Sequence, residues 1–133
     1  RLACGGERVT CGTEGYYLAP TLFVDSTADM RISREEIFGP VANVVKVKDY
    51  DAALAMANDT EFGLAAYFYT RDHARVWRVG EALEYGMVGI NEGIISTEVA
   101  PFGGVKESGL GREGSKYGIE EFTELKYLCM GGV

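Results

Sequence analysis

The sequence has little positive charge, a single histidine and no long apolar run. The 133 residues include thirteen Lys and Arg and twenty Asp and Glu, which gives a formal net charge of −7. Nucleic-acid-binding surfaces concentrate basic residues, and none cluster here, so no nucleic-acid partner is expected. No apolar run reaches the roughly eighteen residues that suggest a membrane span, and "RLACGGERVT" has no apolar signal segment. We expect one domain without a membrane partner, located in the cytoplasm or, if the source is eukaryotic, in the mitochondrial matrix.

Residues that bind metals or act as nucleophiles are also scarce. Cys4, Cys11 and Cys129 lack C-x-x-C spacing, and His73 is the single histidine, so no metal site is expected. A reactive thiol needs an activating base or a positive environment. Because His73 is far from all three cysteines in the sequence, we expect reduced, non-catalytic thiols and a histidine on a solvated helix face.

The middle of the chain alternates between strand and helix patterns. We expect strands at 41–48, 62–70 and 86–91, a helix at 50–58 capped by Asp49, and a helix at 71–85 capped by Thr70 and ended by Gly86. The second helix carries an apolar stripe formed by Val76, Val79, Gly80 and Leu83. Strands that are apolar on both faces and alternate with such helices predict an α/β fold with a parallel sheet and flanking helices.

The two ends of the chain are less regular. Residues 16–26 are expected to be extended with an interruption, and 92–112 form a long glycine-rich irregular segment. A helix over 113–123 and a final strand, "ELKYLCM" at 124–130, are expected to close the chain. A final strand without a partner in its own chain favours pairing with another subunit. Ligands of parallel sheets bind beyond the carboxyl ends of the strands, so the segment after Asn91 is the best candidate site.

Gly109, Gly111 and Gly114 have the spacing of the dinucleotide-binding fingerprint. That motif works only between a strand and a helix, with a second strand following. The preceding "APFGGVKE" is too rich in glycine and proline for a strand, and nineteen residues follow Gly114. We interpret the spacing as a surface loop that leads into the last helix.

Two stretches resemble one enzyme family. "EEIFGPV" at 35–41 and "GMVGINEGIISTEVAPFGGVKESGLGREGSKYGIEEFTELKY" at 86–127 are similar to the carboxyl-terminal part of NAD(P)-dependent aldehyde dehydrogenases. The sequence of the second stretch is most similar to that of the family members that oxidise succinate semialdehyde. The resemblance implies part of a catalytic domain over 1–120, an oligomerisation strand over 121–133, and a homo-oligomer, dimer or tetramer, formed through that strand.

The resemblance also implies roles for four residues. Glu36 would accept hydrogen bonds from the ribose hydroxyls of NAD or NADP, and Phe38 would pack near the nicotinamide. Ser96 would donate its hydroxyl to the distal carboxylate of the aldehyde substrate, and Phe102 would line the substrate channel. The alternatives are an exposed charge at Glu36, core positions for both phenylalanines and an ordinary loop serine.

Arg112 and Glu113 are interpreted as a structural pair at the start of the last helix.

The resemblance further implies what this stretch does not contain. No stretch matches the family's nucleophile motif, its general-base motif or its cofactor-binding half, so we expect a carboxyl-terminal piece of a quarter to a third of a subunit. Alone it would be catalytically inactive and, with uncovered apolar faces, prone to self-association. Two alternatives remain: a related enzyme for glutarate semialdehyde or another short aldehyde acid, and a non-catalytic self-association module.

Overall fold

The computed structural model describes residues 1–132 of the chain. They form two compact units, Arg1–Met56 and a second unit that begins at Ala57. Each unit combines short sheets with one or two helices, so the fold is mixed α/β, as predicted. The predicted division at residue 120 stays a prediction.

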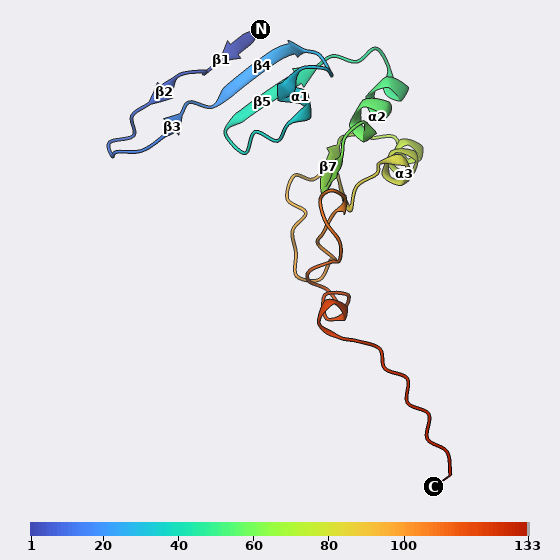
Figure 1. Cartoon of the computed structure of the whole chain (residues 1–133). Coiled ribbons are helices and arrows are strands. Elements are labelled where there is room, and N and C mark those ends of the chain that lie inside the picture. The colour runs from blue at the N-terminus through green and yellow to red at the C-terminus, as the bar shows by residue number, and fades with distance from the viewer. Residues whose placement is uncertain (133) are drawn as a thin grey trace. The chain divides into compact units, whose positions relative to one another are not determined.

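The first unit is built around one central strand, β4 (Figure 1). Its elements are β1 (Leu2–Cys4), β2 (Arg8–Val9), β3 (Tyr17–Leu18), β4 (Thr21–Ser26), α1 (Arg31–Arg34), β5 (Val41–Val45) and most of α2 (Tyr50–Asn58). Strand β4 pairs antiparallel with β1 and parallel with β5, while β2 and β3 form an antiparallel hairpin. The predicted interruption within 16–26 falls between β3 and β4.

Helix α2 begins where its sequence predicts. The Asp49 carboxylate accepts a hydrogen bond from the Ala52 amide at 2.8 Å, and the Asp49 carbonyl accepts one from the Ala53 amide at 3.1 Å. An acidic side chain in this position satisfies an amide that has no partner within the helix. The predicted cap is therefore confirmed.

The second unit contains two separate two-stranded sheets. Its elements are β6 (Phe62–Gly63), β7 (Ala65–Phe68), α3 (His73–Ala82), β8 (Met87–Ile90), β9 (Val105–Lys106) and the 3₁₀ helix η1 (Glu120–Phe122). Strands β7 and β8 are parallel, and β6 pairs antiparallel with β9. The strand expected over 62–70 is thus divided at Leu64, because its first part pairs with a strand inside the segment expected to be irregular.

The limits of helix α3 correct two predictions. Asp72, not Thr70, caps the helix: its carboxylate accepts from the Ala74 amide at 2.8 Å and from the Arg75 amide at 3.2 Å. The Thr70 hydroxyl instead accepts from the Asp72 amide, two residues along the chain, at 3.2 Å. The helix ends at Ala82, before Gly86, whose amide already donates to the Gly63 carbonyl at 2.9 Å.

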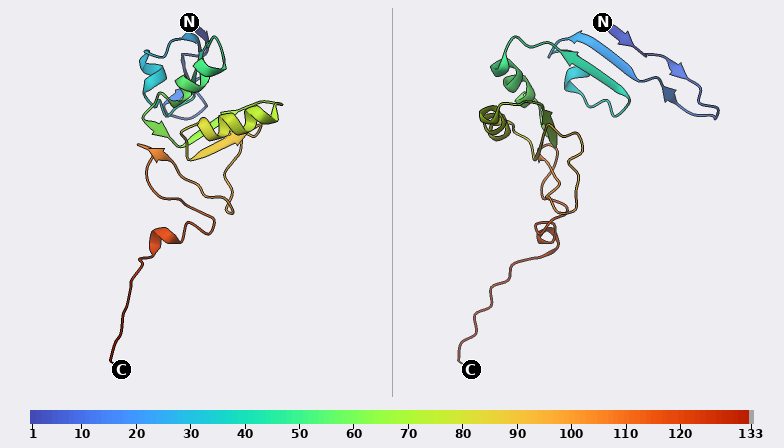
Figure 2. Two further views of the ribbon diagram at one scale, coloured as in Figure 1. Left: turned by 90° about the vertical axis from the view of Figure 1, so that its right-hand side faces the viewer. Right: turned by 180° about the vertical axis from the view of Figure 1, so that it is seen from behind.

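Helix α3 packs against strand β8, and Figure 2 shows the helix beside the β7–β8 pair. Val79 and Leu83, at 8% and 9% exposure, are the only buried hydrophobic residues in the described chain. Val76 and Gly80 are half-buried beside them, and His73 is exposed at the first turn. The predicted stripe and the solvated histidine are both confirmed.

The three predicted strands do not share one sheet, and the parallel pairing of β4 with β5 was not predicted. β4–β5 belongs to a three-stranded sheet in the first unit, and β7–β8 is a two-stranded sheet in the second. No strand pairing in residues 1–132 joins them. The prediction of a single parallel sheet was therefore too simple for this chain.

The carboxyl-terminal helix expected over 113–123 is wrong. Turns occupy this segment, and only η1 is helical. Gly114 and Ser115 have φ values of +65° and +50°, which are incompatible with a right-handed helix at its expected start. Residues 124–132 continue as an exposed extended segment without a strand partner in the described chain, as Figure 1 shows. Pairing of this segment with another subunit stays a prediction.

Candidate functional site

The segment between α1 and β5 presents two adjacent glutamates differently. Arg31 donates to both carboxylate oxygens of Glu35, Nε to Oε1 at 2.9 Å and Nη2 to Oε2 at 2.8 Å. The hydrogen bonds and charge of Arg31 lower the pKa of Glu35. The neighbouring Glu36 carboxylate is exposed and has no hydrogen bond or ion pair among residues 1–132. Both acceptor oxygens of Glu36 are therefore available to a ligand.

Phe38 stands out on the turn that follows. Its φ of +52° is unusual for a bulky side chain, and its ring is 92% exposed. The turn is fixed on its far side, because the Val41 amide donates to the Gly39 carbonyl at 2.7 Å and the Thr21 amide donates to the Pro40 carbonyl at 2.8 Å. The core position considered for Phe38 is not found within this chain. A strained backbone that presents an aromatic ring is typical of a functional segment.

The loop after β8 starts from a side-chain clamp. Asn91, with φ of +56°, accepts from the Thr70 amide through Oδ1 and donates to the Thr70 carbonyl through Nδ2, both at 2.8 Å. These two bonds hold the carboxyl ends of the parallel strands together. Next, the Glu92 carboxylate accepts from the Ile94 and Gly93 amides, which lowers the pKa of Glu92. The loop thus leaves the sheet edge in a defined direction.

Ser96 and Phe102 lie farther along the same loop, in different settings. Ser96 is exposed, and its hydroxyl makes no hydrogen bond within residues 1–132. Phe102 is half-buried, and its backbone pairs with Glu113: the Phe102 amide donates at 2.9 Å and the Glu113 amide donates back at 2.7 Å. No hydrogen bond joins Ser96 to Phe102 in the described chain.

Phe102 lines an open hollow of about 760 Å³ together with the glycine-rich segment that follows it. The other lining residues include Leu64, Leu110, Ile119 and Phe122. Arg112 supports the wall from within, since its Nη1 donates to the Gly104 carbonyl at 2.8 Å and to the Gly111 carbonyl at 2.6 Å. The structural interpretation of Arg112 and Glu113 fits these contacts, although no helix starts there.

The three glycines with the dinucleotide-binding spacing lie in turns of the backbone. Gly109, Gly111 and Gly114 all have positive φ, at +109°, +76° and +65°. Any other residue would be strained in these conformations. Neither a strand–loop–helix unit nor a βαβ unit surrounds them in residues 1–132. The interpretation as a turning loop is confirmed, and the following helix is not.

The sequence reasoning missed three polar residues that shape this region: Asn58, Lys106 and the clamp residue Asn91. Lys106 Nζ contacts the carbonyls of Asn58 and Thr60 and the carboxylate of Glu84. Polar residues at the ends of helices and strands are common in loops, so their type alone carries no signal. The pairing of β6 with β9 brings Lys106 to Asn58, and the parallel pairing of β7 with β8 brings Asn91 to Thr70.

The predicted site residues fall in both units. Glu36 and Phe38 lie on one turn of the first unit, and Ser96 and Phe102 on one loop of the second. Within residues 1–132, no group of three His, Cys, Asp or Glu side chains is placed to hold a metal ion, and no helix is long and apolar enough to cross a membrane. Cys4, Cys11 and Cys129 are exposed free thiols.

Comparison with known proteins places the chain. A sequence model of the Aldehyde dehydrogenase family matches residues 1–128. The chain belongs to the aldehyde dehydrogenase family. The resemblance seen in the two sequence stretches is thereby confirmed over residues 1–128.

Individual relatives of this aldehyde dehydrogenase chain share more than half of its residues. The NADP⁺-dependent succinate-semialdehyde dehydrogenase of Escherichia coli is 62% identical over 131 residues, which cover 98% of this chain and 27% of that protein. A glutarate-semialdehyde dehydrogenase of Pseudomonas putida is also 62% identical, over 130 residues, 98% of this chain and 26% of that protein. A crystal structure of an NADP-dependent enzyme from E. coli superimposes with a TM-score of 0.92 at 62% identity, covering 98% of this chain and 27% of the other. The chain spans about a quarter of the length of these relatives.

Proposed function

We propose that this chain forms part of an NAD(P)-dependent semialdehyde dehydrogenase that oxidises succinic semialdehyde to succinate. The observation that carries the proposal is the high identity to a succinate-semialdehyde dehydrogenase over a stretch that includes the loop with Ser96 and Phe102. We expect such an enzyme in the cytoplasm, or in the mitochondrial matrix of a eukaryote.

The turn with Glu36 and Phe38 fits a nicotinamide cofactor. The unpaired Glu36 carboxylate offers acceptors for two adjacent ribose hydroxyls. The exposed Phe38 ring offers a flat apolar surface beside them. When bound, the cofactor accepts the hydride that the aldehyde carbon loses. In the proposal, these two residues bind and orient the cofactor and take no part in proton transfer.

The loop after β8 provides the substrate contacts in the proposal. The free Ser96 hydroxyl donates to the distal carboxylate of the semialdehyde, and the Phe102 ring forms an apolar wall along its carbon chain. A hydroxyl alone binds an anion weakly, because a carboxylate that leaves water needs charged partners as well. Basic residues outside this chain therefore complete the carboxylate site.

Glutarate semialdehyde is the second candidate substrate. The P. putida relative named for this substrate has the same identity to the chain as the E. coli relative. The two substrates both have an aldehyde and a distal carboxylate, and they differ by one methylene. Because one extra methylene changes transition-state binding only modestly, a single channel accepts both with different efficiencies.

A hybrid enzyme tests the proposal. In the hybrid subunit, this chain replaces the matching 27% of the E. coli relative. We expect the purified hybrid to reduce NAD⁺ or NADP⁺ with succinic semialdehyde, and the 133-residue chain alone to be inactive under the same conditions. The ratio of kcat/KM for succinic and glutaric semialdehyde in the hybrid decides between the two substrates.

Two outcomes would contradict the proposal. A hybrid that assembles like its parent but oxidises neither semialdehyde would favour a non-catalytic self-association module. Turnover by the isolated chain would mean that Cys4, Cys11 or Cys129 acts as a nucleophile. Replacement of each cysteine by serine would then identify the residue.

A further inference from the structure

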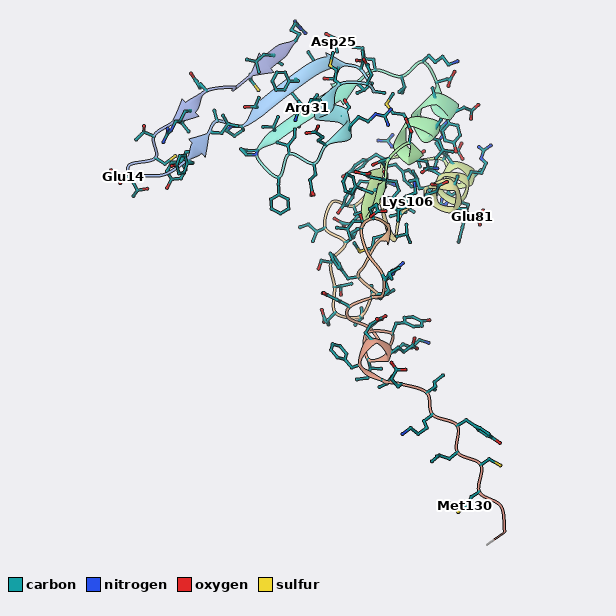
Figure 3. The ribbon with its side chains drawn as sticks, in the orientation of Figure 1. Glu14, Asp25, Arg31, Glu81, Lys106 and Met130 are labelled. Carbon is teal, nitrogen blue, oxygen red and sulfur yellow. The ribbon has the colours of Figure 1, made fainter. Side chains whose placement is uncertain are left out.

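Lys106, the last residue of β9, is held by three partners. Its Nζ donates to the carbonyls of Asn58 at 3.0 Å and Thr60 at 3.2 Å, and it lies 2.6 Å from Oε2 of Glu84. An ammonium group has three protons to donate, so these contacts use all of them. The side chain is 26% exposed, although the residue as a whole belongs to the exposed class. Figure 3 labels Lys106 among the side chains of the second unit, close to the end of α3.

The partners of Lys106 are themselves connected. Asn58 donates through Nδ2 to the carbonyl of Ala82, the last residue of α3, at 2.7 Å, and accepts from the Glu84 amide through Oδ1 at 3.0 Å. The Tyr85 hydroxyl adds a bond to the Ala57 carbonyl at 2.6 Å. Lys106, Asn58 and Glu84 thus form a closed ring of contacts. The ring joins the end of α2, the turn after α3 and strand β9.

The ammonium also complements the end of α2. The last carbonyls of a helix have no partner within it and carry partial negative charge, so a cation is favourable there. Lys106 adopts this position with a φ of +56°, a left-handed backbone conformation that is unfavourable for a residue other than glycine. A strained backbone that persists at a residue with three polar contacts indicates that the contacts determine its place.

Lys106 is four residues from Phe102, and the connection between them is tight. The Gly104 residue is buried, and a side chain at Gly86 would collide with the Gly103 carbonyl. Beyond Lys106, the Glu107 amide donates to the Glu61 carbonyl at 3.0 Å. The chain from Phe102 to Glu107 therefore has little freedom to move independently of the lysine.

We propose that Lys106 is a positioning residue that fixes the Phe102 wall of the substrate channel against the ends of α2 and α3. That Phe102 lines a substrate channel rests on the proposed function. That Lys106 holds the loop rests on the contacts of Lys106 alone. Lys106 does not contact substrate. It acts through the position of Phe102.

Replacement of Lys106 by methionine tests the proposal, because methionine keeps most of the aliphatic length and removes the charge. In the full 133-residue chain and in the hybrid, we expect K106M to accelerate amide hydrogen exchange at Phe102 and Glu107 at least tenfold. In the hybrid, we expect the KM for the semialdehyde to rise at least fivefold while the KM for the cofactor changes less than twofold. Lys106→Arg is expected to retain most of both properties, since a guanidinium still donates to Glu84 and to a carbonyl.

Matched variants separate this role from a loss of charge or of folding. Lys48→Met removes an exposed lysine from the first unit and is expected to leave exchange and KM values unchanged. Glu84→Gln keeps an acceptor for Lys106 and is expected to have a smaller effect than K106M. Unchanged exchange in K106M would overturn the proposal, as would a parallel loss of kcat, cofactor binding and substrate binding. If the unmodified hybrid is inactive, the proposed function fails, and the exchange measurement still decides whether Lys106 holds the loop.

Discussion

At the scale of single residues, the site depends on which polar groups are already occupied. Glu35 and Glu36 are neighbours with the same side chain, yet Arg31 binds the first and nothing in the described chain binds the second. Occupied carboxylates organise the backbone, and unoccupied ones are free to bind ligands. The contrast gives a pair of substitutions in which one serves as the control for the other.

Glu36→Gln in the hybrid enzyme is expected to raise the KM for NAD(P)⁺ about tenfold with little change in kcat. A hydrogen bond to a charged group contributes about 1.5–3 kcal/mol, and the neutral amide recovers only part of it. Steady-state kinetics with varied cofactor measures the effect. Glu35→Gln, which weakens the contact to Arg31 instead, is expected to leave the cofactor KM within twofold. Equal effects of the two substitutions would remove Glu36 from the cofactor site.

At the scale of elements, α3 depends on a charged cap. The amide of Arg75, and next that of Ala74, donate to Asp72 and lower its pKa from the ordinary value of 3.8. The charged cap therefore stabilises the helix fully above that value. The stabilisation is lost as the pH falls through the lowered pKa of the folded state.

Substitution of Asp72 separates the charge of the cap from its shape. Asp72→Asn keeps a good capping side chain but cannot titrate. Relative to this variant, we expect the amides of α3 in the unmodified chain to be better protected at pH 6 and to lose that advantage below pH 3.8. Amide exchange measured on both chains at each pH gives the ratio of their α3 exchange rates directly. Asp72→Ala is expected to weaken α3 at every pH. If the ratio of the α3 exchange rates in the unmodified chain and in Asp72→Asn did not change with pH, the charge effect would be contradicted.

Elements with strong local signals were predictable from the sequence. The apolar stripe of α3 and the Asp49 cap of α2 follow from side-chain type and spacing, and both are confirmed. The Asp72 cap was missed because Thr70, two positions earlier, is also a capping residue type, and only the geometry after β7 selects between them. The prediction of a helix over 113–123 was wrong. The glycines up to Gly114 were interpreted as a loop that ends where the helix begins, whereas the turn continues through Gly114 and Ser115 into the segment expected to be helical.

The segment after Asn91 was predictable as a site from the parallel strands alone, but the individual site residues were predictable only through the family resemblance. Glu36, Phe38, Ser96 and Phe102 are ordinary residue types at positions without periodicity, so no physical pattern distinguishes them. The ring around Lys106 could not be predicted, since it requires residues 48 positions apart to meet through two short strands. Short antiparallel pairs have almost no sequence signature.

At the scale of the whole molecule, the chain buries very little apolar surface. Val79 and Leu83 are the only buried hydrophobic residues in residues 1–132, while most large apolar side chains are exposed. Proteins seldom leave so many large apolar side chains exposed without a partner. The extended segment 124–132 adds a row of exposed apolar residues and unpaired backbone groups, with Met130 near its end (Figure 3).

The isolated chain is therefore expected to self-associate at micromolar concentration. Exposed apolar surface and an unpaired extended segment both favour contact between copies. Sedimentation velocity measures the association. Leu125→Glu, with Glu124→Gln as a control variant in the same segment, is expected to reduce the associated fraction severalfold. A monodisperse monomer of the unmodified chain would show that its apolar surface is covered in solution.

The separation of contacts along the chain also sets an order of assembly. The Asn91 clamp closes a loop of 21 residues, whereas the bond from Lys106 to Asn58 closes one of 48. Longer closures cost more chain entropy and are made more slowly, unless earlier structure shortens them. We therefore expect strands β7 and β8 with α3 to form first and to bring Asn58 and Glu84 together. Strand β9 is then expected to dock on a finished surface, so that the loop that carries Phe102 is the last part of the second unit to mature.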